Sequence, residues 1–313
     1  MKAGIVGTGG VGAACALSIV ARGVARDLVL VDRTRKRARA VAEDLSYGSP
    51  LSRIISLRDG DYGDLEDAAL VVVTVGVNER TGGATDRNDP DGRLRLLETN
   101  AGIYRDVVPR IVRVAPRATL LVVTDPPDPL ADIAREIAGH DHVLSTGTYL
   151  DSLRFRVHLA RELGVSPTSV EAMILGEHGT SEVFVWSSAR VAGASVLREV
   201  ERRRLDRGEF RKKIEHAVRF ANISIIEGNG ASQYGIAMLV ARLTEAILRD
   251  ERLVAPIGKY QSAYGVTLSL PAAIGRKHVE VLEPDLSGDE RRGLELSAEA
   301  LKNARRKIER VGV

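Results

Sequence analysis

The single cysteine in a chain of 313 residues excludes an internal disulfide and is typical of a protein kept in a reducing cytoplasm. No apolar run approaches the roughly 18–20 residues that a membrane-spanning helix needs. The 45 Lys and Arg nearly balance the 42 Asp and Glu. Acids interrupt the basic residues of 201–213, so a solvated helix face is a better interpretation than a nucleic-acid surface. We therefore expect a cytoplasmic protein without nucleic-acid or membrane partners.

A glycine-rich turn lies near the start of the chain, between a short apolar strand and a helix that we predict from the residue pattern. Its motif is Gly-x-Gly-x-x-Gly, formed by Gly7, Gly9 and Gly12. Gly7 permits the tight turn, Gly9 lets the backbone approach a pyrophosphate, and Gly12 lets the helix pack closely on the strand. The N–H groups at the start of the helix can then bind phosphates. We assign these glycines and Val11 to a dinucleotide site.

Asp32 ends the next predicted strand, twenty residues after Gly12. A carboxylate at this place can accept hydrogen bonds from both ribose hydroxyls of NAD, and it would repel the 2′-phosphate of NADP. The neighbouring Arg33 weakens this preference, and the alternative is a glycine turn beside an ordinary strand-end acid. We predict NAD as the cofactor. The remaining predicted cofactor-binding residues follow later strands and are Thr74, Gly76 and Thr124.

The order of the predicted elements indicates an α/β protein with two domains. Apolar strands alternate with helices over residues 1–146, which predicts a Rossmann-type, doubly wound parallel sheet that binds its ligand at the carboxyl ends of the strands. Residues 147–313 read as a mixed α+β catalytic domain with antiparallel strands. In this half we expect a strand pair at residues 170–175 and 183–185, and one long helix over residues 209–227.

His178 is the strongest candidate for a catalytic side chain. It lies between Gly176 and Gly179, after an apolar strand, and a histidine bared by small neighbours can exchange a proton near neutral pH without a metal. The alternative is a structural or solvated histidine. The other histidines show no ligand-like spacing with cysteine or acids, so we predict no metal site. These residues are His140, His142, His158, His216 and His278.

Taken together, these motifs make the chain similar to the L-lactate/malate dehydrogenase family over almost its whole length. The segments that carry the resemblance are residues 7–12, 94–100, 147–156, 176–179 and 235–238. The resemblance implies an NAD-dependent L-2-hydroxy-acid dehydrogenase, lactate-like in its site, that acts on a small 2-oxo or 2-hydroxy acid. It also implies a homodimer or a homotetramer.

The resemblance assigns a role to each of four side chains. His178 matches the acid/base that removes the hydroxyl proton while hydride leaves for nicotinamide, and Asp151 matches its partner carboxylate. Arg154, three residues further on the same helix face, matches the arginine that clamps the substrate carboxylate. Arg93, seven residues before Asn100, matches the lid arginine that polarises the substrate carbonyl. Its nearby rivals are Arg87 and Arg95.

The chain departs from the family in the residues expected around the substrate. The loop 78–93 is longer than usual, and Glu79 stands where lactate enzymes commonly have Gln and malate enzymes have Arg. A Glu would repel the second carboxylate of oxaloacetate, although a shift of register would let Arg80 bind it, which leaves malate dehydrogenase as the alternative. Asp125 stands where the family has Asn. Ser232 stands where lactate-type enzymes often have a small hydroxyl residue, which favours a monocarboxylic acid. We expect a substrate tail that is neutral, polar or cationic.

The resemblance also bears on activation by fructose 1,6-bisphosphate. Some bacterial lactate enzymes bind this molecule with an Arg and a His. Arg156 matches the Arg, but Glu171 stands at the His position and would repel the phosphates. We therefore predict no such activation.

Besides the lactate-type and the malate-type enzyme, a third hypothesis is a nucleotide-binding protein that has lost catalysis. It is disfavoured because His178, Asp151, Arg154 and Arg93 are all present.

Overall fold

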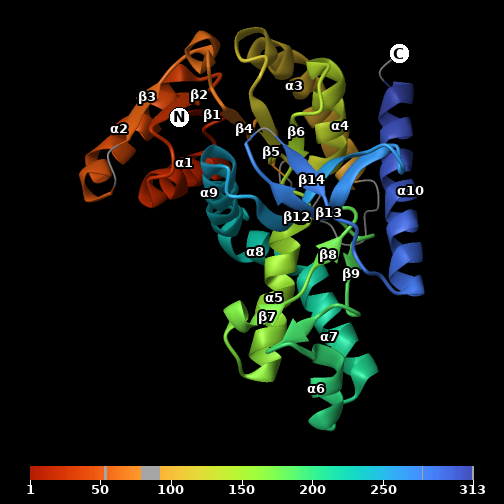
Figure 1. Cartoon of the computed structure of the whole chain (residues 1–313). Coiled ribbons are helices and arrows are strands. Elements are labelled where there is room, and N and C mark those ends of the chain that lie inside the picture. The colour runs from red at the N-terminus through yellow and green to blue at the C-terminus, as the bar shows by residue number, and fades with distance from the viewer. Residues whose placement is uncertain (53–54, 79–91, 277, 312–313) are drawn as a thin grey trace.

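The computed structural model describes the chain except residues 53–54, 79–91, 277 and 312–313. Its centre is a nine-stranded sheet in the order β14-β13-β12-β6-β5-β4-β1-β2-β3 (Figure 1). Six of these strands run parallel: β1 (Lys2–Val6), β2 (Asp27–Val31), β3 (Ser56–Asp59), β4 (Leu70–Val73), β5 (Thr119–Val122) and β6 (Val143–Ser145). Their order, 3-2-1-4-5-6, is the doubly wound order that the alternation of strands and helices predicted.

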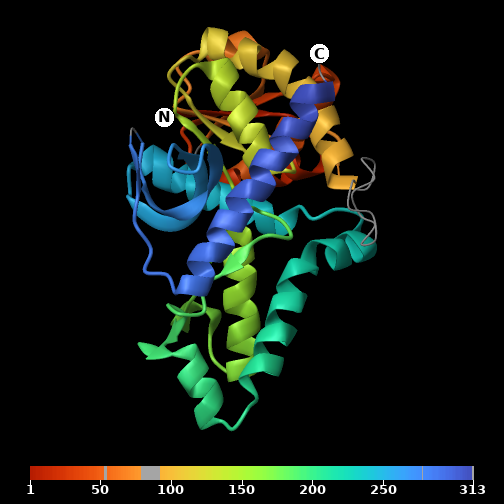
Figure 2. The same cartoon turned by 90° about the vertical axis from the view of Figure 1, so that its right-hand side faces the viewer.

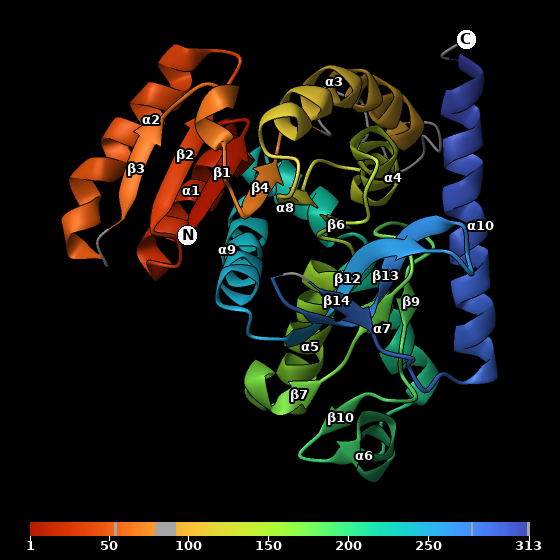
Figure 3. The same cartoon turned by 45° about the horizontal axis from the view of Figure 1, so that its top comes forward.

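Helices cover both faces of this sheet, because the strands are apolar on both sides. Ile5 and Leu30 belong to one core, with α1 (Gly10–Arg22), α2 (Arg35–Gly48) and α9 (Tyr234–Arg249). Val6 and Val31, their neighbours in sequence, belong to the other, with α3 (Gly92–Val114), α4 (Pro127–Ala138) and the end of α10 (Gly288–Val311). Side chains alternate across a strand, so adjacent residues point into different cores. Figure 3 shows α1 and α9 side by side on one side of the strands.

The sheet continues into the second half of the chain, which the sequence pattern did not predict. The strands β12 (Leu253–Gln261), β13 (Val266–Ile274) and β14 (Val279–Val281) form an antiparallel extension. It joins the parallel part where Gly258 pairs with Ser145. The predicted division at residue 146 therefore separates two segments that share one sheet, and it stays a prediction.

The remaining elements form a lobe beside the sheet. They are α5 (Tyr149–Leu163), β7 (Val170–Glu171), β8 (Ile174–Leu175), β9 (Val183–Phe184), β10 (Arg190–Val191), β11 (Ala194–Ser195), α6 (Val196–Arg202), α7 (Arg207–Arg219) and α8 (Ala221–Asn229). Phe155 and Trp186 pack edge to face at the centre of this lobe, with ring centroids 4.8 Å apart. In Figure 2, α10 runs from the lobe along the sheet domain, where it contacts α3 and α4.

Two expectations for this lobe were wrong in detail. The predicted strand 170–175 is two short strands in different sheets, since β7 pairs with β10 and β8 pairs with β9. Between them the carbonyl of Ala172 accepts a hydrogen bond from the Arg156 guanidinium. The predicted helix 209–227 is interrupted at Phe220, whose backbone leaves helical geometry (φ −100°, ψ 4°), so that α7 and α8 are separate helices.

Candidate active site

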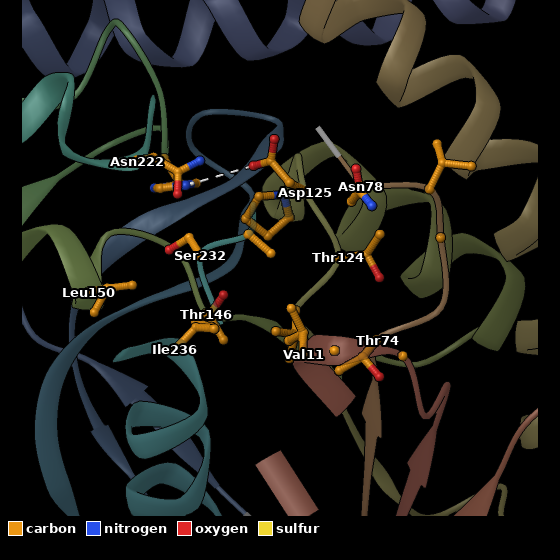
Figure 4. A pocket seen from close by; sticks show the side chains of 18 of the residues that line it. Val11, Thr74, Asn78, Thr124, Asp125, Thr146, Leu150, Asn222, Ser232 and Ile236 are labelled. Carbon is orange, nitrogen blue, oxygen red and sulfur yellow. Dashed lines mark ion pairs between the residues drawn. The ribbon is translucent and has the colours of Figure 1, made fainter. Parts of the chain in front are cut away.

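A cavity of about 210 Å³ lies at the carboxyl ends of the parallel strands. The glycine turn forms one part of its wall, and the loops that follow β4, β5 and β6 form another. The remaining wall comes from α5, the His178 turn and residues in or near α8 and α9. In Figure 4, Val11 and Thr74 lie at one end of this cavity, and Asp125, Asn222 and Ser232 lie toward the other. The predicted site residues that line it are Gly9, Val11, Thr74, Gly76, Thr124, Asp125, Arg154, His178 and Ser232.

The glycine turn has the shape that a dinucleotide requires. Gly7 has a φ of +102°, and a Cβ on Gly12 would lie 1.8 Å from the carbonyl oxygen of Gly7, so helix and strand meet too closely for a side chain. A Cβ on Gly9 would meet no atom within 4 Å, which leaves this backbone open at the N-terminus of α1. The Thr74 hydroxyl donates to the carbonyl of Gly7 at 2.7 Å and fixes the turn. These residues fit the pyrophosphate of NAD.

The Asp32 carboxylate is held in place at the end of β2 by the turn itself. Its Oδ2 accepts hydrogen bonds from the N–H of Thr8 at 2.7 Å and from the Thr8 hydroxyl at 2.9 Å, and its Oδ1 accepts from the N–H of Thr34 at 2.8 Å. Burial alone would raise the pKa of Asp32, but these hydrogen bonds and Arg37 outweigh it and lower the pKa. The group is therefore a fixed anion at the predicted ribose position.

Asn100 joins the strand-end loops beside this site. Its Oδ1 accepts the N–H of Val77 at 2.8 Å, and its Nδ2 donates to the carbonyl of Asp125 at 2.8 Å. The Thr124 hydroxyl donates to the carbonyl of Val75 at 2.7 Å. Sequence reasoning used Asn100 only as a marker of spacing, and no local signal reveals that it ties two loops together.

The N-terminal part of α5 places Asp151 against His178 and Arg154 against Asp151. The Nδ1 of His178 lies 2.5 Å from Oδ2 of Asp151, and the Arg154 guanidinium donates to Oδ1 of the same carboxylate at 2.8 Å. Burial would raise the pKa of Asp151, but the facing imidazole and guanidinium outweigh it and lower the pKa. An ionised Asp151 makes Nδ1 the protonated nitrogen of a neutral imidazole, so Nε2 is the atom left to exchange protons.

Asp125 faces the other side of the same imidazole. Its Oδ1 lies 3.7 Å from Nε2 of His178. Asp125, Arg154 and His178 all line the cavity, so the carboxylate of Asp125, the guanidinium of Arg154 and the imidazole of His178 surround one small volume. Such a volume suits a small acid whose carboxylate pairs with Arg154 and whose hydroxyl or carbonyl oxygen meets Nε2.

Three predicted residues of the substrate loop cannot be placed in this site. Glu79 and Arg80 lie outside the described residues. Arg93 lies in the first turn of α3, but the structure does not describe its side chain. Their proposed roles stay predictions.

Two buried acids near His178 carry no sequence signal. Asp128, on α4, accepts the backbone N–H of His178 at 2.8 Å. Glu182 is 5% exposed, and its Oε1 lies 3.8 Å from Nε of Arg219. Burial and the nearby Asp151 carboxylate raise the pKa of Glu182 well above its ordinary value. The burial of both acids near His178 results from contacts between segments that are far apart in the sequence.

Within the described part of the chain, no three His, Cys, Asp or Glu side chains are arranged to hold a metal ion. Over the same residues, no helix is both long and apolar enough to cross a membrane.

Comparison with known proteins gives matches over nearly the whole chain. Residues 1–144 match the family described as lactate/malate dehydrogenase, NAD binding domain, and residues 148–311 match its alpha/beta C-terminal domain. The L-lactate dehydrogenase of Deinococcus radiodurans is 44% identical over 310 residues, with 98% of this chain and 99% of that protein covered. The L-lactate dehydrogenase of Thermus aquaticus is 44% identical over 312 residues, with 97% and 98% covered.

Solved structures agree with these matches. The minor L-lactate dehydrogenase from Enterococcus mundtii, in a ligand-bound form, superposes with a TM-score of 0.90 at 33% identity, and 98% of each chain is covered. A lactate dehydrogenase from a deep-sea metagenome library of the Medee basin gives a TM-score of 0.90 at 32% identity, again with 98% of each chain covered.

Proposed function

The chain belongs to the lactate/malate dehydrogenase family and is an NAD-dependent 2-hydroxy-acid dehydrogenase, and we propose that it is lactate-like and uses His178 as its acid/base. The observation that carries this proposal is the imidazole of His178, with Nδ1 on Asp151 at 2.5 Å and the ring in a cavity that it shares with Arg154.

The chain's own residues divide the work of the reaction. Arg154 holds the substrate carboxylate and so orients the carbon that carries the hydroxyl. His178 takes the hydroxyl proton at Nε2 during oxidation and returns it during reduction, while Asp151 stabilises the imidazolium that forms. We assign the polarisation of the carbonyl to Arg93. Bound NAD supplies the hydride acceptor, held by Gly7, Gly9, Val11, Gly12 and Asp32, with Thr74, Gly76 and Thr124 at the strand ends.

Replacing Asp32 with serine is expected to weaken the preference for NADH. The variant loses the anion that would bind the ribose hydroxyls, so kcat/KM for NADH should fall by about tenfold, and turnover with NADPH should rise because its phosphate is no longer repelled. Steady-state kinetics with both cofactors measure the effect. The control is Asp44→Ser on the exposed side of α2, which should behave as wild type. An unchanged NADH/NADPH ratio in the Asp32 variant would place the ribose elsewhere.

We propose that the substrate is a 2-oxo acid whose tail carries no second carboxylate. Asp125 supports this, because its carboxylate lies in the cavity 3.7 Å from Nε2 of His178 and would repel a second anion. Ser232 lines the same cavity and suits a small or polar tail. We propose that the carboxylate of Glu79 also repels a second carboxylate on the substrate. Malate dehydrogenase activity through Arg80 is the alternative.

A panel of pyruvate, longer 2-oxo acids and oxaloacetate separates these substrates. We expect kcat/KM for pyruvate or a longer monocarboxylic acid to exceed that for oxaloacetate. Asp125→Asn removes one negative charge from the cavity and should raise kcat/KM for oxaloacetate by about tenfold relative to pyruvate. Glu79→Arg should act in the same direction if that residue faces the substrate. A wild-type preference for oxaloacetate would favour malate and Arg80 instead.

We also propose a homodimer or homotetramer in the cytoplasm. Leu17 of α1 and Met238 of α9 are large apolar side chains that are 54% and 68% exposed on two helices that pack together, which supports an apolar contact between subunits. The single cysteine, Cys15, is buried and is not part of a disulfide. Activation by fructose 1,6-bisphosphate is not expected, since Glu171 is exposed where a cation would be needed and Arg156 donates to the carbonyl of Ala172.

A further inference from the structure

Asp128 is a buried carboxylate that connects the sheet domain to the His178 turn. It lies in the first turn of α4 and is 1% exposed. Its Oδ2 accepts the backbone N–H of His178 at 2.8 Å, and its Oδ1 accepts the hydroxyl of Ser145, at the end of β6, at 2.5 Å. A Cβ on Gly258 of β12 would come within 2.7 Å of Oδ1, so the neighbouring strand leaves room for the carboxylate only because it has no side chain there.

We propose that Asp128 is a positioning residue for the acid/base reaction, and that its carboxylate holds the backbone of His178 where Nδ1 meets Asp151 and the ring faces the cavity. The proposal rests on the proposed role of His178. His178 is thereby held at two points by different elements. Its backbone N–H is bonded to Asp128 of α4, and its ring Nδ1 lies on Asp151 of α5. Two such anchors restrict the ring to one orientation, which is what proton transfer to a bound substrate requires.

The charge of Asp128 matters as well as its shape. The backbone N–H of His178 can only donate, so Oδ2 of Asp128 must accept from it whether or not Asp128 is protonated. A proton added to Asp128 therefore belongs on Oδ1, where the Ser145 hydroxyl can turn to accept it. Protonation therefore keeps both contacts but turns a charge-assisted hydrogen bond to His178 into a neutral, weaker one.

The change of protonation falls in mildly acidic solution. Burial raises the pKa of Asp128 to about 6, and the hydrogen bonds from Ser145 and His178, together with the His178 ring when it is protonated, only partly oppose it. The nearby Glu177 carboxylate raises it further, and Gly258, from β12, contributes no charge. Below this pH the carboxyl becomes neutral, so the anchor on His178 weakens as the solution is acidified.

The variant Asp128→Asn tests the charge with little change of shape. The amide oxygen can accept from His178 while the amide N–H donates to Ser145, so the variant is expected to fold. We expect kcat/KM for 2-oxo-acid reduction to fall by about tenfold, with KM for NADH close to wild type. The acidic limb of the kcat profile near pH 6 should be lost. A merely structural role would not remove that limb.

Asp132, one turn further along α4, provides a matched control. It is also buried, burial raises its pKa to about 6, and it accepts hydrogen bonds from the N–H and hydroxyl of Thr267 and none from the His178 turn. Asp132→Asn therefore removes a similar carboxyl from the same helix. We expect it to retain the wild-type pH profile and kcat.

A measurement that does not depend on turnover separates this proposal from the proposed function. With ¹⁵N-histidine labelling of the full chain, the His178 backbone amide is identified by its loss in His178→Asn, and its shift is followed against pH. An inflection near pH 6 is expected in wild type and in Asp132→Asn, and should be absent in Asp128→Asn. Persistence of that inflection in Asp128→Asn, or an unchanged pH profile of kcat, would overturn the proposal. A wild type that reduces no 2-oxo acid would instead overturn the proposed function.

Discussion

Replacing His178 with asparagine will lower kcat for 2-oxo-acid reduction by about a thousandfold, the range that a positioned acid/base contributes. Asparagine can fill much of the same space and can still donate a hydrogen bond to Asp151, but it cannot carry a proton to the substrate oxygen. The effect should appear in kcat at saturating substrate. Steady-state rates with NADH and the best acid of the panel measure it.

Binding supplies the control for this variant. The cofactor residues Gly7 and Asp32 come directly after β1 and β2, away from the His178 turn in the sequence. The affinity for NADH, followed by its fluorescence, should therefore stay close to wild type. A matched histidine is His158, on the same helix as Asp151 but outside the cavity lining, and His158→Asn should retain full activity. Turnover near the wild-type rate in His178→Asn would mean that another group moves the proton.

Replacing Arg154 with glutamine will lower kcat/KM for the acid substrate by roughly a hundredfold to ten-thousandfold, as expected for the loss of two charge-assisted hydrogen bonds to a carboxylate. The guanidinium side chain is 13% exposed and lines the cavity, so water replaces it poorly. Because Arg154 also donates to Asp151, the variant should lower kcat as well as raise KM. Initial rates over a wide range of substrate concentrations separate the two effects.

The conservative variant distinguishes charge from geometry at this position. Arg154→Lys keeps the positive charge but loses the planar fork, so it should recover only part of the lost kcat/KM. Arg161, exposed at the end of the same helix, is the matched control, and Arg161→Gln should match wild type. Equal activity of wild type and Arg154→Gln would place the substrate carboxylate away from this guanidinium.

The parts of the fold that the sequence predicted are those with strong local periodicity. The buried strands β4 and β5 are apolar runs, and the turn from Gly7 to Gly12 has the glycine spacing of a dinucleotide-binding turn between a strand and a helix. The pairing of Asp151 with Arg154 followed from the helical period, since residues three apart share a face. Their approach to His178 was implied by the family resemblance, and the 2.5 Å contact came from the structure.

The features that the sequence did not predict depend on contacts between distant segments. The strand β12 contains Pro256 and Gly258, which argue against a strand in isolation, yet it pairs along its length with β13 and through Gly258 with Ser145. Asp128 is one acid in a helix that carries several, and only the approach of β6 and the His178 turn gives it a function. Long-range pairing of this kind leaves no periodic trace in the chain.

The measurement that tests the central account most directly is a single turnover of His178→Asn that has been loaded with NADH and mixed rapidly with the preferred 2-oxo acid. Loss of NADH absorbance then reports the chemical step alone, free of product release. The account predicts a rapid loss in wild type and a loss about a thousandfold slower in the variant, at equal NADH occupancy. A rapid loss in the variant would contradict the role of His178 as the acid/base.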